Sequence, residues 1–281
     1  MLIDTHVNVW SERFDPRHHA PAWLPSVFRT PLADMGLAQI DVDMTSAGVT
    51  GVVLVQTTNE FGHTDELLRA ASESTREARV VGWLPISDPE QMAAALRRYQ
   101  NEPALVGVRH RILDTEDPEL LLREATARSL DLVSEAGLVL DVLPWPHSVL
   151  AQIPTLAARH PELTIVIDLM GWPDIASGRL QPWTDQLAAA GSTPNVLLKV
   201  GGFYRIADED SIPQQWHPYT ATAVEVFGTE RMMVASDWPA VTMTNHTYVE
   251  SIRSALAAFP DLTDAERTQL SGGTAARAYR F

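Results

Sequence analysis

The sequence predicts an α/β protein built as one (β/α)8 TIM barrel that spans residues 1–281. The chain has 281 residues, close to the roughly 250 that one such barrel takes. Short runs rich in Val, Ile and Leu alternate along it with longer amphipathic stretches. This pattern is typical of parallel strands that are buried on both faces and covered by helices. Eight runs of each kind can be counted, which is the number that a closed barrel needs.

Each predicted strand is a short apolar run followed by a predicted helix. The strands are expected at Leu2–Val7, Gly51–Gln56, Val80–Pro85, Leu105–Arg109, Leu138–Leu143, Thr164–Asp168, Val196–Val200 and Met232–Asp237. The helices are expected at Ala38–Ala47, Thr64–Glu77, Pro89–Tyr99, Pro118–Glu135, His147–Arg159, Leu180–Ala190, Gln215–Phe227 and His246–Phe259. An open doubly wound sheet is the alternative, but no Gly-rich phosphate loop follows the first strand.

Local signals set several boundaries. Asp88 and Asp117 each precede a proline, which predicts an N-cap followed by Pro at the first helical position. Gly137 follows a predicted helix and is expected to close it in a left-handed conformation. The segment Ser11–Pro31 contains four prolines and no clean periodicity. It is expected to be a long loop on the catalytic side of the barrel, with His18 and His19 as lid residues.

Composition excludes several classes of function. The chain contains no cysteine, which excludes disulfides, thiolate metal ligands and a Cys nucleophile. Lys and Arg number 21 against 36 Asp and Glu, a net charge of −15, and the basic residues are scattered, so no nucleic-acid partner is expected. No apolar run approaches the roughly 20 residues that span a bilayer. The chain opens MLIDTHVNVW without a secretory leader, which predicts a cytoplasmic protein with no membrane partner.

The first and eighth strands carry the strongest catalytic candidates. His6 and Asn8 alternate with Val7 and should point into the barrel. Asp237 follows an apolar run, where a buried carboxylate is costly unless it is paired or does chemistry. Because these two strands are neighbours in a closed barrel, His6 and Asp237 are expected to approach each other. The alternative is that an inward-facing His6 is structural.

Other strand ends supply candidate contacts for a small-molecule substrate. Gln56 ends the second strand and Arg109 ends the fourth. Arg109 is expected to clamp a substrate carboxylate, the alternative being a pair with a structural Asp. Tyr204 and Arg205 follow the seventh strand and are suited to an anionic or aromatic substrate. Two aromatic candidates follow the fifth and sixth strands, Trp145 and Trp172. They are expected either to line a pocket or to pack loops against the rim of the barrel.

Five segments resemble the amidohydrolase superfamily, in the branch that includes 2-pyrone-4,6-dicarboxylate lactonase and sugar-lactone hydrolases. They are Ile3–Trp10, Gly48–Val49 with Val53–Gln56, Gly107–Arg109, Ile165–Gly171 and Met232–Pro239. The ending Gly273–Tyr279 is similar to the C-terminal helix of that family. The resemblance covers nearly the whole chain and implies a TIM-barrel hydrolase that can form a homodimer.

Two departures from the family pattern concern the metal site. The family has His-x-His at the first strand, where this chain has His6 and Asn8, and Asp-His-x-Gly at the sixth, where it has Leu169. Of the usual metal positions only His6 and Asp237 are kept, whereas a catalytic site normally has three good protein ligands. We therefore expect no tightly bound catalytic metal and no cofactor. A weakly bound divalent ion at these two residues stays open.

The resemblance then implies hydrolysis of a lactone or similarly activated cyclic carbonyl without metal. In that branch the Asp at the position of Asp237 acts as general base on water, and His6 and Asn8 would polarise or orient the carbonyl. Two alternatives stay open: a lyase or isomerase that decarboxylates or transfers a proton on the same barrel, and a binding protein without catalytic activity.

Overall fold

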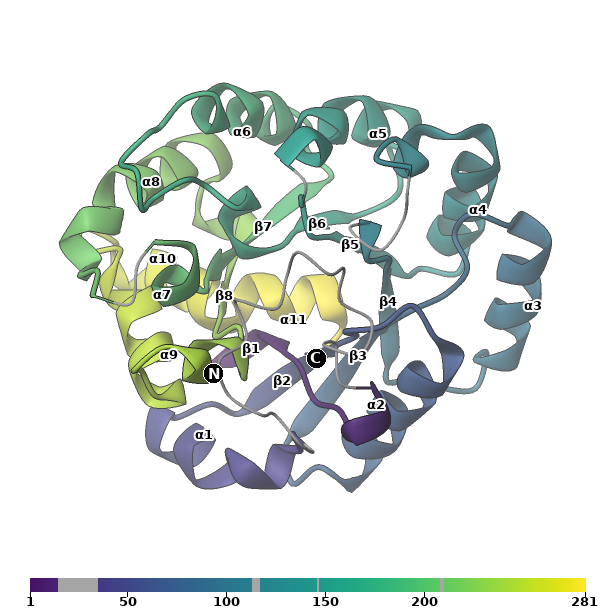
Figure 1. Ribbon diagram of the computed structural model, residues 1–281, viewed down its shortest axis with the longest axis horizontal. Coiled ribbons are helices and arrows are strands. Elements are labelled where there is room, and N and C mark those ends of the chain that lie inside the picture. Colours follow the sequence, from purple (N-terminus) through teal and green to yellow (C-terminus); the bar gives the residue numbers. More distant parts are fainter. Residues whose placement is uncertain (15–34, 113–116, 146, 208–209) are drawn as a thin grey trace.

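The computed structural model describes residues 1–14, 35–112, 117–145, 147–207 and 210–281, apart from the side chains of Glu12, His147, Arg205 and Met243. Eight parallel strands form one sheet in the order of the sequence, and helices surround it (Figure 1). The strands are β1 Ile3–Val7, β2 Gly51–Val55, β3 Glu77–Gly82, β4 Leu105–Arg109, β5 Val139–Val142, β6 Ile165–Ile167, β7 Val196–Gly201 and β8 Met232–Ala235. The predicted (β/α)8 barrel is confirmed.

The barrel closes between β1 and β8. The backbone N–H of Asp237 donates to the carbonyl oxygen of His6 at 3.1 Å, and that of Asn8 donates to Trp238 at 2.8 Å. Below them the Thr5 hydroxyl donates to the carbonyl of Val234 at 2.7 Å. The first and last strands are therefore neighbours, as predicted.

Helices and short helical turns cover the outside of the strands. The α-helices are α1 Asp41–Ala47, α2 Phe61–Glu73, α3 Pro89–Arg98, α4 Glu124–Glu135, α5 Ile153–Arg159, α6 Trp183–Gly191, α7 Phe203–Ile206, α8 Pro213–Phe227, α9 Tyr248–Ala257, α10 Asp264–Thr268 and α11 Thr274–Tyr279. Most predicted elements lie within a few residues of these bounds. The third strand begins at Glu77, three residues before the predicted start, because the exposed Glu77 and the partly exposed Arg79 interrupt its apolar run.

The three predicted boundaries have different outcomes. The Asp88 carboxylate accepts from the N–H groups of Glu90 and Gln91, and Gly137 has φ +68°, so this N-cap and this C-terminal glycine are confirmed. At Asp117 the predicted helix is absent but the cap is present, since the Asp117 carboxylate accepts from the N–H of Glu119 at 3.0 Å. A 3-10 turn, Leu120–Leu122, follows it, and α4 begins only at Glu124 because the extended backbone of Arg123 interrupts the helix.

Two apolar layers separate the inside of the barrel from its helical coat. Val7 and Val9 belong to the layer between strands and helices, so His6, between Val7 and Thr5, faces the interior as predicted. The inner layer fills the strand-start end of the barrel, and α11 contributes to it; its members are Ile3, Val53, Val55, Val81, Val106, Val139, Val166, Met233, Ala275 and Tyr279. A register shift between Asp4 and Val7 lets both Ile3 and His6 face inward.

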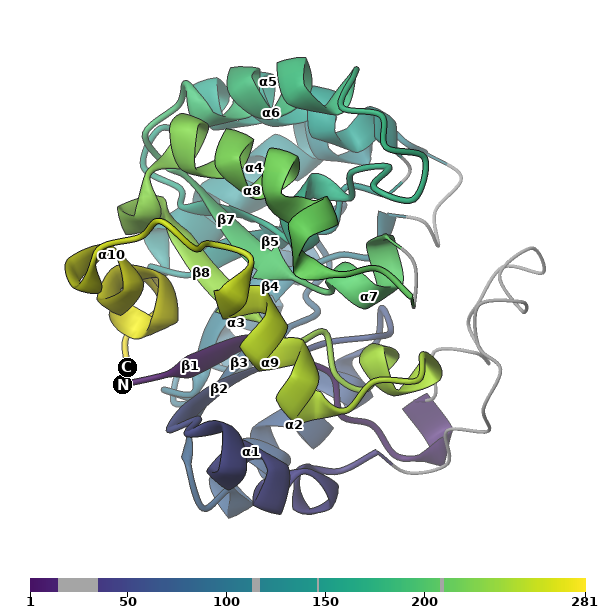
Figure 2. The ribbon, with the colours of Figure 1, turned by 90° about the vertical axis from the view of Figure 1, so that its left-hand side faces the viewer.

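The two ends of the barrel differ. Both termini lie where the strands start, whereas α7 lies at the opposite end, beyond the strand C-termini (Figure 2). Much of the predicted loop Ser11–Pro31, with His18 and His19, lies outside the described residues.

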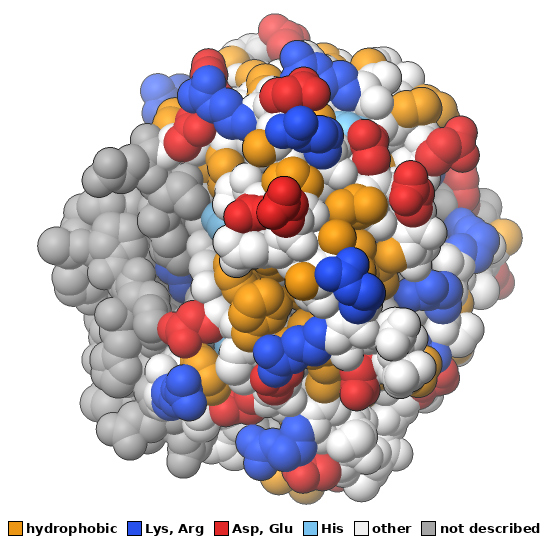
Figure 3. All heavy atoms as spheres, turned by 90° about the vertical axis from the view of Figure 1, so that its right-hand side faces the viewer, with side chains coloured by type: hydrophobic (Ala, Val, Ile, Leu, Met, Phe, Trp, Pro, Cys, Tyr) orange, Lys and Arg blue, Asp and Glu red, His pale blue; other side chains and the backbone are white. Residues whose placement is uncertain are grey.

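The surface bears on the predicted partners. On the face drawn in Figure 3, basic and acidic side chains are interspersed rather than gathered in a basic stripe. None of the described helices is long and apolar enough to span a bilayer. The absence of a nucleic-acid partner stays a prediction.

Candidate active site

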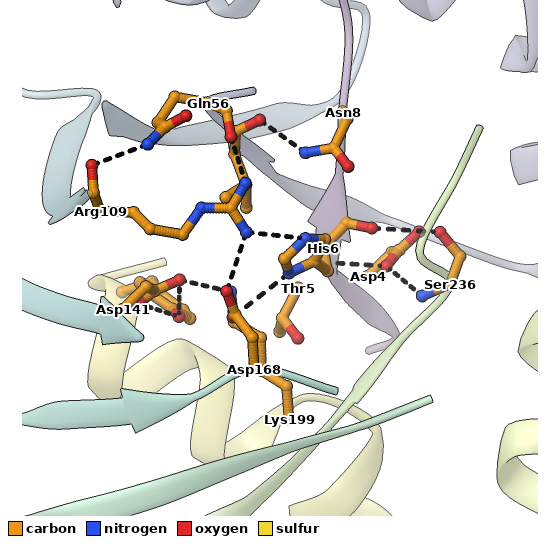
Figure 4. A network of polar contacts seen from close by, with 12 residues as sticks. Asp4, Thr5, His6, Asn8, Gln56, Arg109, Asp141, Asp168, Lys199 and Ser236 are labelled. Atoms are coloured by element: carbon orange, nitrogen blue, oxygen red, sulfur yellow. Dashed lines mark hydrogen bonds and ion pairs between the residues drawn. The ribbon is translucent and has the colours of Figure 1, made fainter. Parts of the chain in front are cut away.

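The imidazole of His6 lies inside the barrel and is 2% exposed. Its Nδ1 is 3.3 Å from Oδ1 of Asp168, and its Nε2 is 3.3 Å from Nη1 of Arg109 (Figure 4). A guanidinium only donates, so Nε2 accepts from Arg109 and the proton lies on Nδ1, toward Asp168. Burial lowers the pKa of His6, against the opposing charge of Asp168, so the ring is neutral at neutral pH.

These contacts refine two expectations. The backbones of His6 and Asp237 are hydrogen-bonded, but the described contacts of the His6 ring are with Asp168 and Arg109. His6 and Asp237 therefore approach each other as predicted, but through their backbones, and the His6 side chain pairs with Asp168, which follows β6. Because Nε2 accepts from Arg109 in this arrangement, the ring orients that guanidinium and has no proton there to donate to a carbonyl.

Asp168, directly after β6, is the centre of an ionic cluster. Besides the imidazole it contacts Nη1 of Arg109 at 2.9 Å and Nζ of Lys199 at 3.1 Å. Burial by itself would raise the pKa of Asp168, but Lys199, His6 and Arg109 together hold it well below its usual range. Asp168 is therefore an anion at any pH near neutrality.

Lys199 and Asp141 extend this cluster toward the start of the barrel and were missed by the sequence predictions. Nζ of Lys199 is 2.5 Å from Oδ2 of Asp141, and both side chains are fully buried. The hydroxyl of Tyr279, from α11, donates to the same carboxylate at 2.9 Å. Burial raises the pKa of Asp141 to about 6, and the charge of Lys199 offsets only part of that shift. Lys199 is the only lysine of the chain and lies in an apolar strand, a signal that could have found it.

Arg109 lies inside the barrel, where its guanidinium pairs with Asp168 and donates to the carbonyl of Gln56. This is the structural alternative considered for Arg109. Its Nε–H is nevertheless buried without a hydrogen-bond partner in the described part of the chain, as is Oε1 of Gln56. Nε2 of Gln56 donates to the carbonyl of Arg109 at 2.8 Å, and Nδ2 of Asn8 donates to Val55 at 2.7 Å. One side-chain N–H of Asn8 is thus bonded to the backbone of β2.

Asp237 follows β8 and is 1% exposed. Its φ is +59°, in the left-handed region that few non-glycine residues occupy. Its carboxylate lies beside Gly202 after β7, where an added Cβ would stand 3.4 Å from Oδ2. Such backbone conformations gather at functional sites because surrounding structure has to enforce them.

The remaining candidates lie in the loops beyond β5, β6 and β7. The Tyr204 hydroxyl is 2.7 Å from that of Ser254, and its ring stacks on His246. These contacts fit packing between α7 and α9 better than the predicted substrate contact. The side chain of Arg205 lies outside the described residues. Trp145 and Trp172 pack on each other with ring centroids 5.6 Å apart, and both stay partly exposed, so a pocket wall and rim packing both stay open.

Two further histidines hold the loops around this end of the barrel. Nε2 of His63 donates to the carbonyl of Val9 at 2.9 Å, and its Nδ1 accepts from the N–H of Thr57 at 3.2 Å. His110 accepts from the indole N–H of Trp83 at 3.1 Å. Burial lowers the pKa of His63 and that of His110 to about 4, so both rings are neutral.

A divalent metal ion does not fit the donors that these residues offer. Nε2 of His6 faces a guanidinium, Asn8 is tied to Val55, and Leu169 has no donor atom. Two of the buried carboxylates, Asp168 and Asp141, are already engaged by the cations Arg109 and Lys199. Among the described residues, no three His, Cys, Asp or Glu side chains are grouped as metal ligands.

Comparisons with known proteins agree with this barrel. Two L-fucono-1,5-lactonases are 28% identical to the chain. The one from Burkholderia ambifaria matches over 246 residues, which are 87% of this chain and 82% of that protein. The one from Burkholderia multivorans aligns over 292 positions, gaps included, which cover 99% of this chain and 96% of that protein. The crystal structure of an amidohydrolase from Burkholderia multivorans with bound zinc superposes with a TM-score of 0.90 at 26% identity, covering 100% of this chain and 99% of that one.

The match to a protein family extends over nearly the full sequence. The profile described as Amidohydrolase covers residues 3–281, and it includes every strand of the barrel. The chain therefore belongs to the amidohydrolase family of hydrolases.

Proposed function

We propose that this protein hydrolyses a lactone without a metal ion, with Asp237 as the general base that activates water. The observation that carries the proposal is the buried Asp237 carboxylate, held at the C-terminal end of β8 in a left-handed backbone conformation. In TIM-barrel enzymes this end of the strands holds the catalytic groups. The lactone as substrate class is supported by the two L-fucono-1,5-lactonases that are 28% identical to the chain.

The reaction adds one water across the ester bond of the ring. Asp237 accepts a proton from water while the water oxygen bonds to the carbonyl carbon, which forms a tetrahedral oxyanion. The bond to the ring oxygen then breaks, and that oxygen takes the proton from Asp237. The product is a hydroxy acid, and the Asp237 carboxylate is regenerated.

Arg109 is the group proposed to hold the carbonyl oxygen. Three of its contacts fix the guanidinium: the Asp168 carboxylate, the His6 ring and the carbonyl of Gln56. Its buried Nε–H has no partner among the described residues. Burying a donor without an acceptor costs about 1–3 kcal/mol, a cost that a bound carbonyl oxygen would remove. An oxyanion gains more from such a fixed donor than a neutral carbonyl does.

Metal independence is supported by the donor set rather than by the relatives. The Burkholderia multivorans amidohydrolase was crystallised with zinc, and that zinc is a property of that protein. In this chain Asn8 and Leu169 stand at two of the positions where the resembled family has histidine. The lactone ring is an activated ester with a better leaving group than an amide, so its hydrolysis depends less on Lewis-acid activation of the carbonyl.

The experiment compares wild type, Asp237→Asn and the surface control Asp131→Asn on L-fucono-1,5-lactone and simple 1,5-lactones in heavy-oxygen water. Wild type is expected to place one heavy oxygen in the carboxylate of the product. Asp237→Asn should lose roughly 100- to 10,000-fold in kcat, and Asp131→Asn should keep full activity. Unchanged turnover in Asp237→Asn would refute the general base. Conversion without oxygen label would favour a lyase or isomerase, and binding without conversion would favour a binding protein.

A further inference from the structure

A chain of buried charged and polar groups runs down the inside of the barrel, and its lower half has no role in the proposed reaction. Starting from Arg109 and His6 at the strand ends, it passes through Asp168 to Lys199, then to Asp141 and the hydroxyl of Tyr279. The close-up in Figure 4 shows the side chains of Arg109, Asp168 and Lys199 pointing toward one another from separate parts of the sheet.

We propose that Lys199 is a positioning residue. Its ammonium fixes Asp168 in place, and Asp168 in turn sets the proton position of His6 and the plane of the Arg109 guanidinium. The part of the proposal that concerns turnover rests on the lactone hydrolysis proposed above. The part that concerns His6 can be tested without any substrate.

Geometry places Lys199 at the branch point of this network. Its Nζ is 2.5 Å from Oδ2 of Asp141 and 3.1 Å from Oδ1 of Asp168. It also lies over the Tyr279 ring, 5.4 Å from the centroid. The ammonium donates a hydrogen bond to Asp141, forms an ion pair with Asp168 and lies over an aromatic face. Oδ1 of Asp168 is also the atom that faces Nδ1 of His6, so lysine and histidine meet at one oxygen.

The choice of lysine at this position is specific. The chain has 21 cationic Lys and Arg residues, and Lys199 is the only lysine among them. A guanidinium is planar and carries five donors, whereas an ammonium is a compact point charge. The site offers two carboxylate oxygens and one aromatic face around a fully buried position, which suits the ammonium and would leave part of a guanidinium unpaired.

Stability alone does not explain why this whole set of charges is present. A buried ion pair pays a desolvation cost that often exceeds its Coulomb gain, and apolar residues of similar volume commonly replace one without loss. Inward-facing neighbours of Lys199 on the adjacent strands, Val166 on β6 and Met233 on β8, are apolar and fully buried. An ionic layer kept inside such an apolar barrel therefore points to a role in the site above it.

The charge of Lys199 affects the protonation of His6. The His6 ring contacts Asp168, which follows β6, and Arg109 on β4, and Lys199 on β7 contacts the same Asp168 carboxylate. The positive charge of Lys199 disfavours the imidazolium and helps to keep Asp168 ionised. Without Lys199, the His6 ring binds a proton more readily and Nε2 becomes a donor. The guanidinium of Arg109 then loses its acceptor and turns away from the orientation that the carbonyl needs.

The first test reads His6 directly. Histidine ring nitrogens are labelled with nitrogen-15, and the His6 signal is assigned by its absence from a folded His6→Gln protein. In wild type the ring should be neutral with its proton on Nδ1. In Lys199→Met the His6 titration should move to higher pH, and kcat should fall roughly 10- to 100-fold with little change in KM. Unchanged His6 titration in a folded Lys199→Met protein overturns the proposal.

The second test restores the charge at one position and covers the case in which Lys199→Met does not fold. The chain has no cysteine, so Lys199→Cys can be alkylated selectively in the unfolded state and refolded. Alkylation with 2-bromoethylamine regenerates an ammonium, and alkylation with iodoacetamide gives a neutral group of similar length as the matched control. The ammonium form should recover the wild-type His6 titration and most of kcat, and the neutral form should recover neither.

The outcomes separate the two proposals. Equal His6 titration and equal turnover in the two alkylated forms would show that the charge is irrelevant, and would overturn the role of Lys199. If wild type hydrolyses no lactone, the proposed function fails, while the nitrogen-15 signal of His6 still decides the role of Lys199.

Discussion

Replacing Asp168 with asparagine is expected to destabilise the protein strongly. The carboxylate is fully buried, 2.9 Å from Nη1 of Arg109 and 3.1 Å from Nζ of Lys199. With Asp141 it balances these two cations, so Asp168→Asn leaves one positive charge uncompensated inside the barrel. Removing one partner of a buried pair typically costs about 3–5 kcal/mol. We expect a loss of this size in the free energy of unfolding.

Urea unfolding followed by tryptophan fluorescence and far-ultraviolet circular dichroism measures this loss, because the chain has eight tryptophans as probes. The matched control is Asp131→Asn. Asp131 also contacts a histidine, His160, at 2.9 Å, but its side chain is 63% exposed, and a pair of this kind contributes at most about 1 kcal/mol. A loss below about 1 kcal/mol in Asp168→Asn would refute the charge balance described for the barrel interior.

Two further predictions concern the buried histidines and the glycine beside Asp237. His63 and His110 have folded-state pKa values near 4, against an ordinary value of 6.5. The unfolded chain therefore binds more protons between these values, and stability should fall as pH drops from 6.5 to 4, by up to about 3 kcal/mol for each residue. Urea unfolding at a series of pH values checks this prediction. The free energy of unfolding of His63→Gln should depend less steeply on pH than that of wild type. Gly202→Ala and Gly48→Ala, at φ +67° and +78°, should each lose about 1–2 kcal/mol of stability. Only the first puts a Cβ within 3.3 Å of the Asp237 side chain, so turnover should fall in Gly202→Ala alone; equal turnover in both would refute the role given to this contact.

The periodic features of this fold are those that the sequence predicts best. Alternation in β1 predicts that His6 faces inward, because Val7 and Val9 need the apolar layer beneath the helices. Closure of the barrel likewise follows from the count of strands, and it makes β1 and β8 neighbours. Both inferences use only the alternation of side chains along a strand and the requirement that the sheet have no open edge.

The partners of the buried charges could not be predicted in the same way. The imidazole of His6 contacts Asp168 and Arg109, which lie 162 and 103 residues after His6 in the sequence. Which side chains share one level of a barrel depends on the shear of the sheet and on local irregularities such as the register shift in β1. Lys199 was detectable as a single lysine in an apolar strand, but its two carboxylate partners were not.

The central claim is that Asp237 activates water without a metal ion. The most direct test is the steady-state rate of lactone hydrolysis by wild type after exhaustive chelation, with the zinc content of the same sample determined by mass spectrometry. We predict full turnover in protein that contains far less than one zinc per chain, no gain on adding zinc, and loss of that turnover in Asp237→Asn. Turnover that disappears with the metal and returns in proportion to added zinc would contradict the account.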